Sequence, residues 1–278
     1  MLRFGPAGIP IECSGGTLEG IRCTKELGLE AMEMEFVRGV KMSQALAAEC
    51  GAEAKKLDVK LSAHGPYAIS LISEKKETAK ASAERVLQTA RVLDNAGGER
   101  VVFHSGYYGK WSKEESFKEM KKAFKEMIEK IESEGLKNII LAPETTGGMK
   151  EWGSLEELVA LAEEFGLKRV WPTIDYAHIH CREGKPKLRE KGDFLKIFDL
   201  MEKKLGKKAV ENVHSHATDV FYREKGEVHH LPIGEGNINW KWLFEVIKEN
   251  GLGGTIISES PLIEKDALKL KKMWETTK

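Results

Sequence analysis

The chain has 278 residues, a length that is long for one β-sandwich and usual for one α/β barrel. Hydrophobic residues make up 41% of the sequence, enough for a sizeable core, and the 44 basic and 44 acidic side chains balance. Bulk charge therefore gives no case for a nucleic acid or a membrane as partner. No segment stays apolar over the roughly 20 residues of a membrane span, and the N-terminus lacks the pattern of a secretory signal.

The four cysteines, Cys13, Cys23, Cys50 and Cys181, are scattered along the chain. None forms a Cys-x-x-Cys pair, and no predicted strand ends in a cysteine. This distribution argues against a closed structural zinc site. We expect free, reduced thiols and a cytoplasmic protein.

Short apolar runs alternate with longer amphipathic stretches. The runs predict eight strands, at Leu2–Gly5, Ala31–Phe36, Lys60–His64, Arg100–His104, Asn138–Glu144, Val170–Asp175, Val210–His216 and Gly254–Glu259. Apolar residues at helical spacing predict helices over Glu74–Ala96, Lys113–Ser133, Ser154–Phe165 and Lys265–Trp274. Helix starts are indicated by capping-box patterns at Ser112 and Ser154, and helix ends by Gly135 and Gly166.

Strict alternation of strand and helix predicts parallel strands joined by right-handed crossovers. Eight such units predict closure into a (β/α)8 TIM barrel, an α/β fold that occupies residues 1–278 as a single domain. A doubly wound open sheet is the alternative, but no GxGxxG or GxxxxGKS/T motif follows the first strand. No linker rich in Pro, Gly or Ser divides the chain.

Six of the eight predicted strands end in a side chain that can bind a metal. Because the active site of this fold lies at the carboxyl ends of the strands, these side chains should converge there. Mixed imidazole and carboxylate ligands suit Zn²⁺, Mn²⁺ or Fe²⁺, and so many of them indicate more than one ion. The six are His64, His104, Glu144, Asp175, His216 and Glu259, and His178, His229 and His230 follow in the loops after two strands.

Each of these candidate residues also has a purely structural explanation. A single histidine at a strand end is usually packed or hydrogen-bonded, and only the joint placement favours a metal site. His214 shares a strand face with His216 but lies deeper, so we expect it to support a ligand. We expect His180 to lie in a loop, and Trp240 and Trp242 to be packing residues on a helix.

The strand-end motifs resemble those of endonuclease IV, the zinc-dependent apurinic/apyrimidinic (AP) endonucleases within the xylose-isomerase-like barrels. The likeness is greatest to archaeal and thermophilic members, and GEGN after a histidine-rich loop is its most specific part. The motifs follow the family's order: His64-Gly-Pro-Tyr67, Phe103-His104-Ser-Gly106, Pro143-Glu144-Thr-Thr-Gly147, Ile174-Asp175-x-x-His178, His216-x-x-Asp219, His230-x-x-x-Gly234-Glu-Gly-Asn237 and Ser258-Glu259-Ser.

The resemblance implies two or three zinc ions, with Mn²⁺ or Fe²⁺ as other possibilities. In the family the third ion also takes an Asp-x-His motif. Here an ungapped alignment puts Val228 at the Asp and His230 at the His, whereas a shift of one residue would use Glu227 and His229. We expect His230 and leave the shift open. The implied sets are His64, His104 and Glu144; Glu144, Asp175, His216 and Glu259; and His178 with His230.

The resemblance implies that a monomer cleaves damaged double-stranded DNA 5′ to abasic sites in base excision repair. A metal-activated hydroxide would attack the phosphate, and Glu144 or Glu259 would orient or deprotonate the water. Tyr67 matches a family tyrosine that contacts DNA beside the lesion. Arg38 is the candidate for the minor-groove arginine, because the loop after the second strand is shortened to Glu35–Lys41.

A sugar isomerase or epimerase of the same barrel superfamily is the alternative. Such enzymes use one divalent ion, so most of the strand-end histidines would be surplus, which favours the multi-zinc hydrolase. A non-catalytic metal-binding protein is a third hypothesis, which the open set of ligands argues against. The one-ion set would be Glu144, Asp175, His216 and Glu259.

Overall fold

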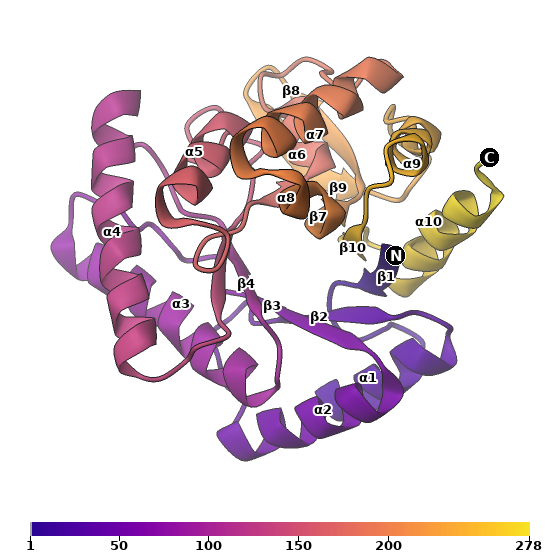
Figure 1. The fold of residues 1–278 in the computed structure, drawn as a ribbon, viewed down its shortest axis with the longest axis horizontal. Coiled ribbons are helices and arrows are strands. Elements are labelled where there is room, and N and C mark those ends of the chain that lie inside the picture. The colour runs from indigo at the N-terminus through magenta and orange to yellow at the C-terminus, as the bar shows by residue number, and fades with distance from the viewer. Residues whose placement is uncertain (1) are drawn as a thin grey trace.

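Eight parallel strands form the centre of the molecule in a computed structural model that describes residues 2–278 (Figure 1). The strands are β1 (Leu2–Pro6), β2 (Ala31–Glu35), β3 (Lys60–His64), β4 (Arg100–Phe103), β5 (Ile140–Pro143), β6 (Thr173–Asp175), β7 (Val213–Ala217) and β10 (Gly254–Ser258). They are hydrogen-bonded in the orders β1-β10-β7-β6 and β2-β3-β4-β5. Parallel bridges from Ala7 to Glu33 and from Glu144 to Thr173 join these two halves. The ring is closed, and the predicted (β/α)8 barrel is confirmed.

Helices lie around the outside of the strands (Figure 1). Both predicted capping boxes are present, at Ser112 before α4 and at Ser154 before α5. Gly135 and Gly166 follow the ends of these helices with positive φ angles of 77° and 76°, as predicted. Among the described residues, no helix combines the length and apolar character that crossing a bilayer requires. The helices are α1 (Thr17–Glu26), α2 (Gln44–Leu57), α3 (Lys76–Asn95), α4 (Lys113–Ser133), α5 (Leu155–Phe165), α6 (Tyr176–Cys181), α7 (Lys191–Leu205), α8 (Lys207–Glu211), α9 (Trp240–Glu249) and α10 (Glu264–Thr276).

Three predicted strands begin too early. The strand predicted from Asn138 starts in a turn, and β5 begins only at Ile140. The run predicted from Val210 starts in α8, because Val210 is buried in the same apolar core as β7 and the boundary is hidden. The strand predicted from Val170 is interrupted by Pro172, which has no amide hydrogen to donate, and β6 begins only at Thr173. The strand ends that carry the predicted ligands are unaffected.

Strand alternation sends apolar side chains outward and polar ones into the barrel. On β2, Met32 and Met34 pack in the core beneath the helices. Glu33 between them is buried and accepts hydrogen bonds from Ser62 of β3 and from His214 of β7. The apolar core therefore lies between strands and helices, while the barrel interior is polar.

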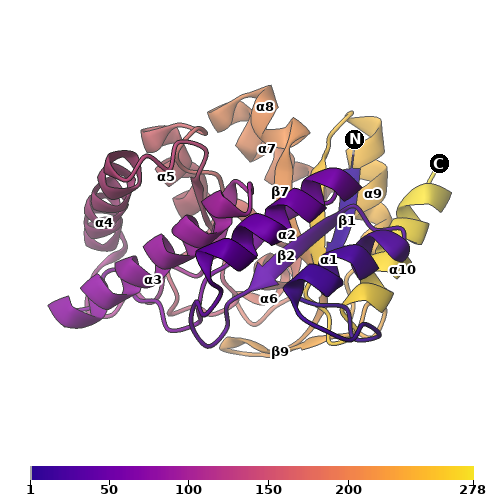
Figure 2. The ribbon, with the colours of Figure 1, turned by 90° about the horizontal axis from the view of Figure 1, so that it is seen from below.

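An antiparallel hairpin of β8 (Asp219–Arg223) and β9 (Gly226–Leu231) follows β7. His229 and His230 belong to β9, so the prediction that they lie in a loop is wrong. The hairpin marks the carboxyl mouth of the barrel, and α8, which precedes β7, marks the amino mouth. Figure 2 shows the two on opposite sides of the molecule.

The prediction of four free thiols is wrong. Cys13, in the segment after β1, and Cys23, in α1, form a disulfide with Cα atoms 6.3 Å apart. Cys50 and Cys181 are free and buried. The pairing depends on the fold of the segment between β1 and α1, which the sequence spacing of these two cysteines does not reveal.

Candidate metal centre

Glu144, which follows β5, occupies the centre of the carboxyl mouth. Its side chain is fully buried. Its two oxygens lie 3.1 to 3.2 Å from ring nitrogens of four histidines that come from β3, the end of β4, α6 and β7. Elements far apart in the sequence thus meet at one carboxylate. The four are His64, His104, His178 and His216.

The other predicted ligands lie in the same cluster. Asp175 is buried at the end of β6, and its Oδ1 accepts the backbone amide of His178 at 2.6 Å. Glu259 Oε1 lies 3.1 Å from His216 Nδ1. Among the described residues, ligand atoms fall within 4.8 Å of one another in five groups, of which two contain Glu33 and three hold the predicted ligands. These three are His64, His104 and Glu144; Glu144, Asp175, His216 and Glu259; and Asp175, His178 and His230. All six strand-end residues, with His178 and His230, therefore converge at one mouth.

Four of these histidines are each held by one ring nitrogen, and the other nitrogen faces the cluster. A carbonyl or carboxylate oxygen only accepts, so the bonded nitrogen carries the proton. In a neutral ring the lone pair of the other nitrogen is then free to bind a metal. The bonds are His64 Nδ1 to Gly65 O (2.8 Å), His178 Nδ1 to Thr145 O (2.8 Å), His216 Nε2 to Glu33 Oε1 (2.8 Å) and His230 Nδ1 to Glu259 O (3.1 Å).

Several buried atoms of the cluster form no hydrogen bond within residues 2–278, although three of them lie within 3.2 Å of an oppositely charged group. Buried polar atoms rarely lack a hydrogen bond in a native protein, and a bound cation would satisfy these atoms. Carboxylate oxygens and imidazole nitrogens at such spacing are the ligands of Zn²⁺ and related ions, and the residues present fit a metal. The atoms are Glu144 Oε1, Asp175 Oδ2, His216 Nδ1 and His230 Nε2.

The charges of the cluster compensate one another. Burial acts to raise the pKa of Glu144, but the charges of His216 and His104 outweigh it and hold the pKa well below its ordinary value. Burial acts to lower the pKa of His64, but Glu144 and Glu35 raise it to about 10. Glu227 and Glu259 similarly raise the pKa of His230 to about 9 against the effect of burial. These rings therefore hold protons at neutral pH when no metal competes for them.

Metal binding is consequently expected to release protons and to strengthen with pH. A coordinated imidazole cannot keep the proton on its ligand nitrogen, so metal and proton compete at His64 and His230. Below the raised pKa values, apparent affinity should rise about tenfold per pH unit for each proton released. Calorimetric Zn²⁺ titrations between about pH 6 and 8, in buffers of different ionisation enthalpy, measure this. Binding without proton release, or affinity that falls with pH, would contradict the assignment.

The β8–β9 hairpin supplies the outermost ligands through a β-bulge. In β9, Glu227 and His229 pair with adjacent residues of β8, which leaves Val228 as an extra residue between them. Regular alternation would put Glu227 and His230 on opposite faces of the strand. The bulge brings them together, with Glu227 Oε1 3.2 Å from His230 Nε2.

Glu227 lies beside the third group of candidate ligands, because its Oε2 is also 2.9 Å from His178 Nε2. The structure thus takes one residue from each of the two sequence alignments, His230 as the imidazole and Glu227 as the carboxylate. Val228 is 49% exposed, and His229 packs against Phe221 with ring centroids 5.3 Å apart. A bulge changes the face of every residue beyond it, so an alignment of regular strand residues does not bring Glu227 and His230 together.

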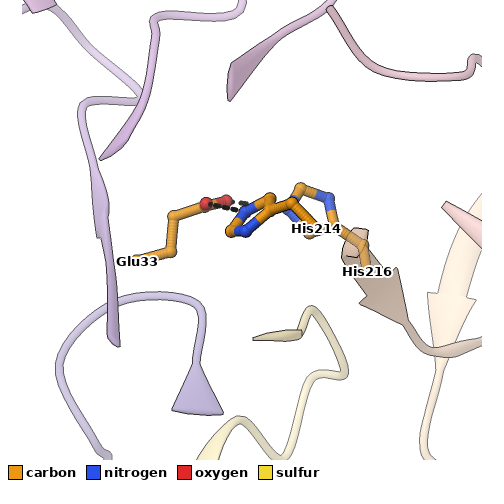
Figure 3. A group of neighbouring side chains, drawn as sticks. All are labelled: Glu33, His214 and His216. Carbon is orange, nitrogen blue, oxygen red and sulfur yellow. Dashed lines mark hydrogen bonds and ion pairs between the residues drawn. The ribbon is translucent and has the colours of Figure 1, made fainter. Parts of the chain in front are cut away.

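Two acids of β2, Glu33 and Glu35, belong to the site but were not predicted from the sequence. Glu33 points across the barrel toward His214 and His216 and accepts from Nε2 of each ring at 2.8 Å (Figure 3). Burial lowers the pKa of His214 to about 4 despite Glu33, so this ring is neutral and supports the cluster, as expected from its depth. Burial raises the pKa of Glu35 to about 8. The sequence signal was the alternation Ala-Met-Glu-Met-Glu, with acids on one face of a buried strand.

The GEGN segment, Gly234 to Asn237, packs against the β8–β9 hairpin and against α6. Asp219 accepts the amides of Gly234 (2.6 Å) and Gly236 (3.2 Å), and a Cβ at Gly236 would come within 2.8 Å of the Asp219 side chain. His180 was predicted to lie in a loop, which is wrong. It is buried in α6, where its Nε2 pairs with Asn237 Oδ1 at 2.8 Å. Trp240 is buried in α9, which confirms it as a packing residue.

A cavity of about 450 Å³ leads from the cluster to solvent. Tyr67 stands at its edge, 67% exposed, with its ring centroid 6.3 Å from that of His64. Arg38 lies apart from the cavity, in an exposed turn after β2. The lining residues are Glu35, His64, Tyr67, His104, His178, Glu227, His229, His230, Glu259 and Pro261.

The sequence matches the xylose isomerase-like TIM barrel family over residues 21–276, and the chain belongs to this family. The superfamily contains both endonuclease IV and sugar epimerases. A relative from Methanocaldococcus jannaschii, "Uncharacterized protein MJ0133", is 36% identical over 274 residues, which are 99% of this chain and 97% of the relative.

Solved structures of both kinds of enzyme share the fold. Endonuclease IV from Thermus thermophilus matches with a TM-score of 0.71 and 20% identity over 97% of each chain. A D-tagatose 3-epimerase-like protein has a TM-score of 0.71 and 21% identity over 97% of this chain and 96% of its own. The 3-keto-D-glucoside 4-epimerase YcjR from E. coli has a TM-score of 0.70 and 16% identity over 99% and 98%. At these identities the likeness shows the fold alone, so a choice between activities has to rest on the site.

Proposed function

We propose that the protein is a zinc-dependent phosphodiesterase of the endonuclease IV type, which cleaves DNA 5′ to abasic sites. One observation carries this proposal. Besides the two groups that contain Glu33, the candidate ligand atoms form three groups linked through Glu144 and Asp175, and the four-residue set is only one of these. The third group, around His178 and His230, gains Glu227 through the bulge in β9.

A single-ion isomerase would leave much of this cluster without a role. Burying histidines and acids is costly unless they are paired or bind a metal. Here even the rings outside the four-residue set, such as His64 and His178, are oriented by a carbonyl on their far side. Several divalent ions bound together would lower the pKa of a coordinated water and neutralise charge on a phosphodiester, which is chemistry that phosphoryl transfer uses.

The two carboxylates implied in catalysis have different surroundings. Glu144 is closed off from solvent by four histidines, so its role is to hold the ligand groups together. The side chain of Glu259 is 15% exposed and lines the cavity. Glu259 is therefore the group placed to orient the attacking water and accept its proton.

The surface around the cavity supports a substrate larger than a sugar. No Lys or Arg is among the described residues that line the cavity, so a phosphate would depend on bound cations for its counter-charge. Exposed apolar side chains follow strand after strand around the mouth, where they could pack against sugars and bases. They are Ile11, Val37, Tyr67, Tyr107, Met149, Phe221, Val228 and Leu262.

The test compares His230→Ala with a control variant, Lys118→Gln, on the exposed face of α4. Metal-loaded wild type and Lys118→Gln should nick a duplex with one abasic-site analogue on its 5′ side, and leave the intact duplex uncut. His230→Ala should lose one bound ion and at least about a hundredfold in nicking rate. Metal analysis and gel assays measure both. No nicking by wild type, or equal activity of the two variants, would refute the proposal.

A sugar epimerase is the second candidate, and one observation favours it. Glu144, Asp175, His216 and Glu259 form a group that by itself satisfies one divalent ion. If the protein is an epimerase, purified protein carries a single ion per chain, and His230→Ala changes neither the ion content nor the epimerisation of a ketose. Metal content therefore separates the two candidates before any substrate is tried.

A further inference from the structure

A second cavity, of about 420 Å³, opens at the amino mouth of the barrel, opposite the metal centre. Residues before or at the start of strands β3 to β7 line it, together with α8. Among the described residues that line it, six are basic and only Glu99 is acidic. The basic residues are Lys60, Arg100, Lys137, Lys168, Arg169 and Lys208.

The positive charge of this cavity is largely uncompensated within residues 2–278. Arg169 is paired with Glu132 at 2.8 Å. No ion pair involves Arg100 or any of the four lysines. Several like charges converge on one concave surface, which concentrates the potential and favours an anion.

Arg100 forms the floor of the cavity. Its residue is only 4% exposed, its Nη2 donates to the Asn212 carbonyl at 2.6 Å, and its guanidinium lies 4.5 Å from the ring centroid of Trp171. Its Nε and Nη1 have no hydrogen-bond partner among the described residues. Nor has Nε1 of Trp171, which is also 4% exposed.

These unpartnered groups are all donors. Arginine and tryptophan side chains have no acceptor, so each can be satisfied only by an oxygen or other acceptor from outside. Burial lowers the pKa of Arg100 to about 10, which leaves it charged at neutral pH. A buried charge without a partner is costly, and guanidinium groups pair best with oxyanions through two hydrogen bonds.

We propose that this cavity binds a phosphate group, with Arg100 and Trp171 as buried donors and the lysines at its rim. Inorganic phosphate and the phosphate of a small phosphoester share this chemistry, and the volume leaves room for the ester's organic part. The site lies at the opposite mouth from the metal centre, so this inference is independent of the proposed function.

The test is a calorimetric titration of metal-loaded protein with inorganic phosphate and with a sugar phosphate, against chloride at equal ionic strength. Arg100→Gln should weaken phosphate binding at least about tenfold. Lys118→Gln, on the exposed face of α4, is the control and should bind like wild type. Phosphate bound at the metal centre would not respond to Arg100, so the difference between variants isolates this cavity.

A second variant tests the same cavity in case Arg100→Gln does not fold. Lys60→Gln/Lys168→Gln removes rim charges but keeps the buried guanidinium, and it should weaken binding severalfold and make it less dependent on salt than in wild type. Tighter binding of the sugar phosphate than of phosphate identifies an ester as the ligand, and the reverse order identifies the free ion. Binding no stronger than that of chloride, or unchanged in both variants, overturns the proposal.

Discussion

Glu144→Gln is expected to reduce the bound metal from several ions to one at most, and to lower nicking by at least about a thousandfold. The substitution keeps the size of the side chain but removes the charge that four histidines surround. Because Glu144 belongs to two ligand groups, its loss weakens both at once.

Metal analysis after dialysis, circular dichroism and the gel assay check this prediction together. Glu235→Gln is the matched control, since Glu235 is an exposed glutamate of the GEGN segment near the same mouth. It should keep full metal content and activity. If Glu144→Gln is folded and retains the metal content of wild type, Glu144 is not the bridging ligand.

Glu33→Gln is expected to weaken metal binding by about 10- to 100-fold without removing a ligand. The Glu33 carboxylate accepts from His214 and His216, and an amide can accept through only one of its two heavy atoms. The His216 ring would then be less firmly oriented, and its Nδ1 less basic toward a metal. Glu33 is thus a positioning residue that acts through His216.

Competition of Zn²⁺ with a chromogenic chelator measures that affinity directly. Thermal melting of the metal-free protein shows whether Glu33→Gln is folded. Glu49→Gln, on the exposed face of α2, is the control. A folded Glu33→Gln protein with wild-type affinity would mean that Glu33 only fills the barrel interior.

The ligands at the strand ends could be predicted because the fold itself brings them together. Once parallel strands alternate with helices, every carboxyl end lies at the same mouth, so His64 and Asp175 need no contact information to be placed side by side. The apolar runs mark the strands well enough for this, although the strands predicted from Val210 and Val170 begin later in the structure.

The remaining residues of the site depend on details that periodicity alone does not carry. Glu33 points into the barrel below the strand end, where the sequence predicts no ligand. Glu227 joins His230 only because one residue of β9 bulges out of the ladder. The Cys13–Cys23 bond likewise depends on the path of one segment and not on a repeating pattern.

The way in which the barrel closes means that bound metal would also stabilise the fold. The two four-stranded halves share no continuous strand ladder and are joined by isolated bridges, which link Ala7 to Glu33, Leu141 to Val170 and Glu144 to Thr173. The ligand set spans that seam, with His104 from one half and His216 and Glu259 from the other. Ions bound there would link the two halves of the barrel. At a free concentration a hundred times its dissociation constant, each ion would add about 2.7 kcal/mol to the free energy needed to separate the halves.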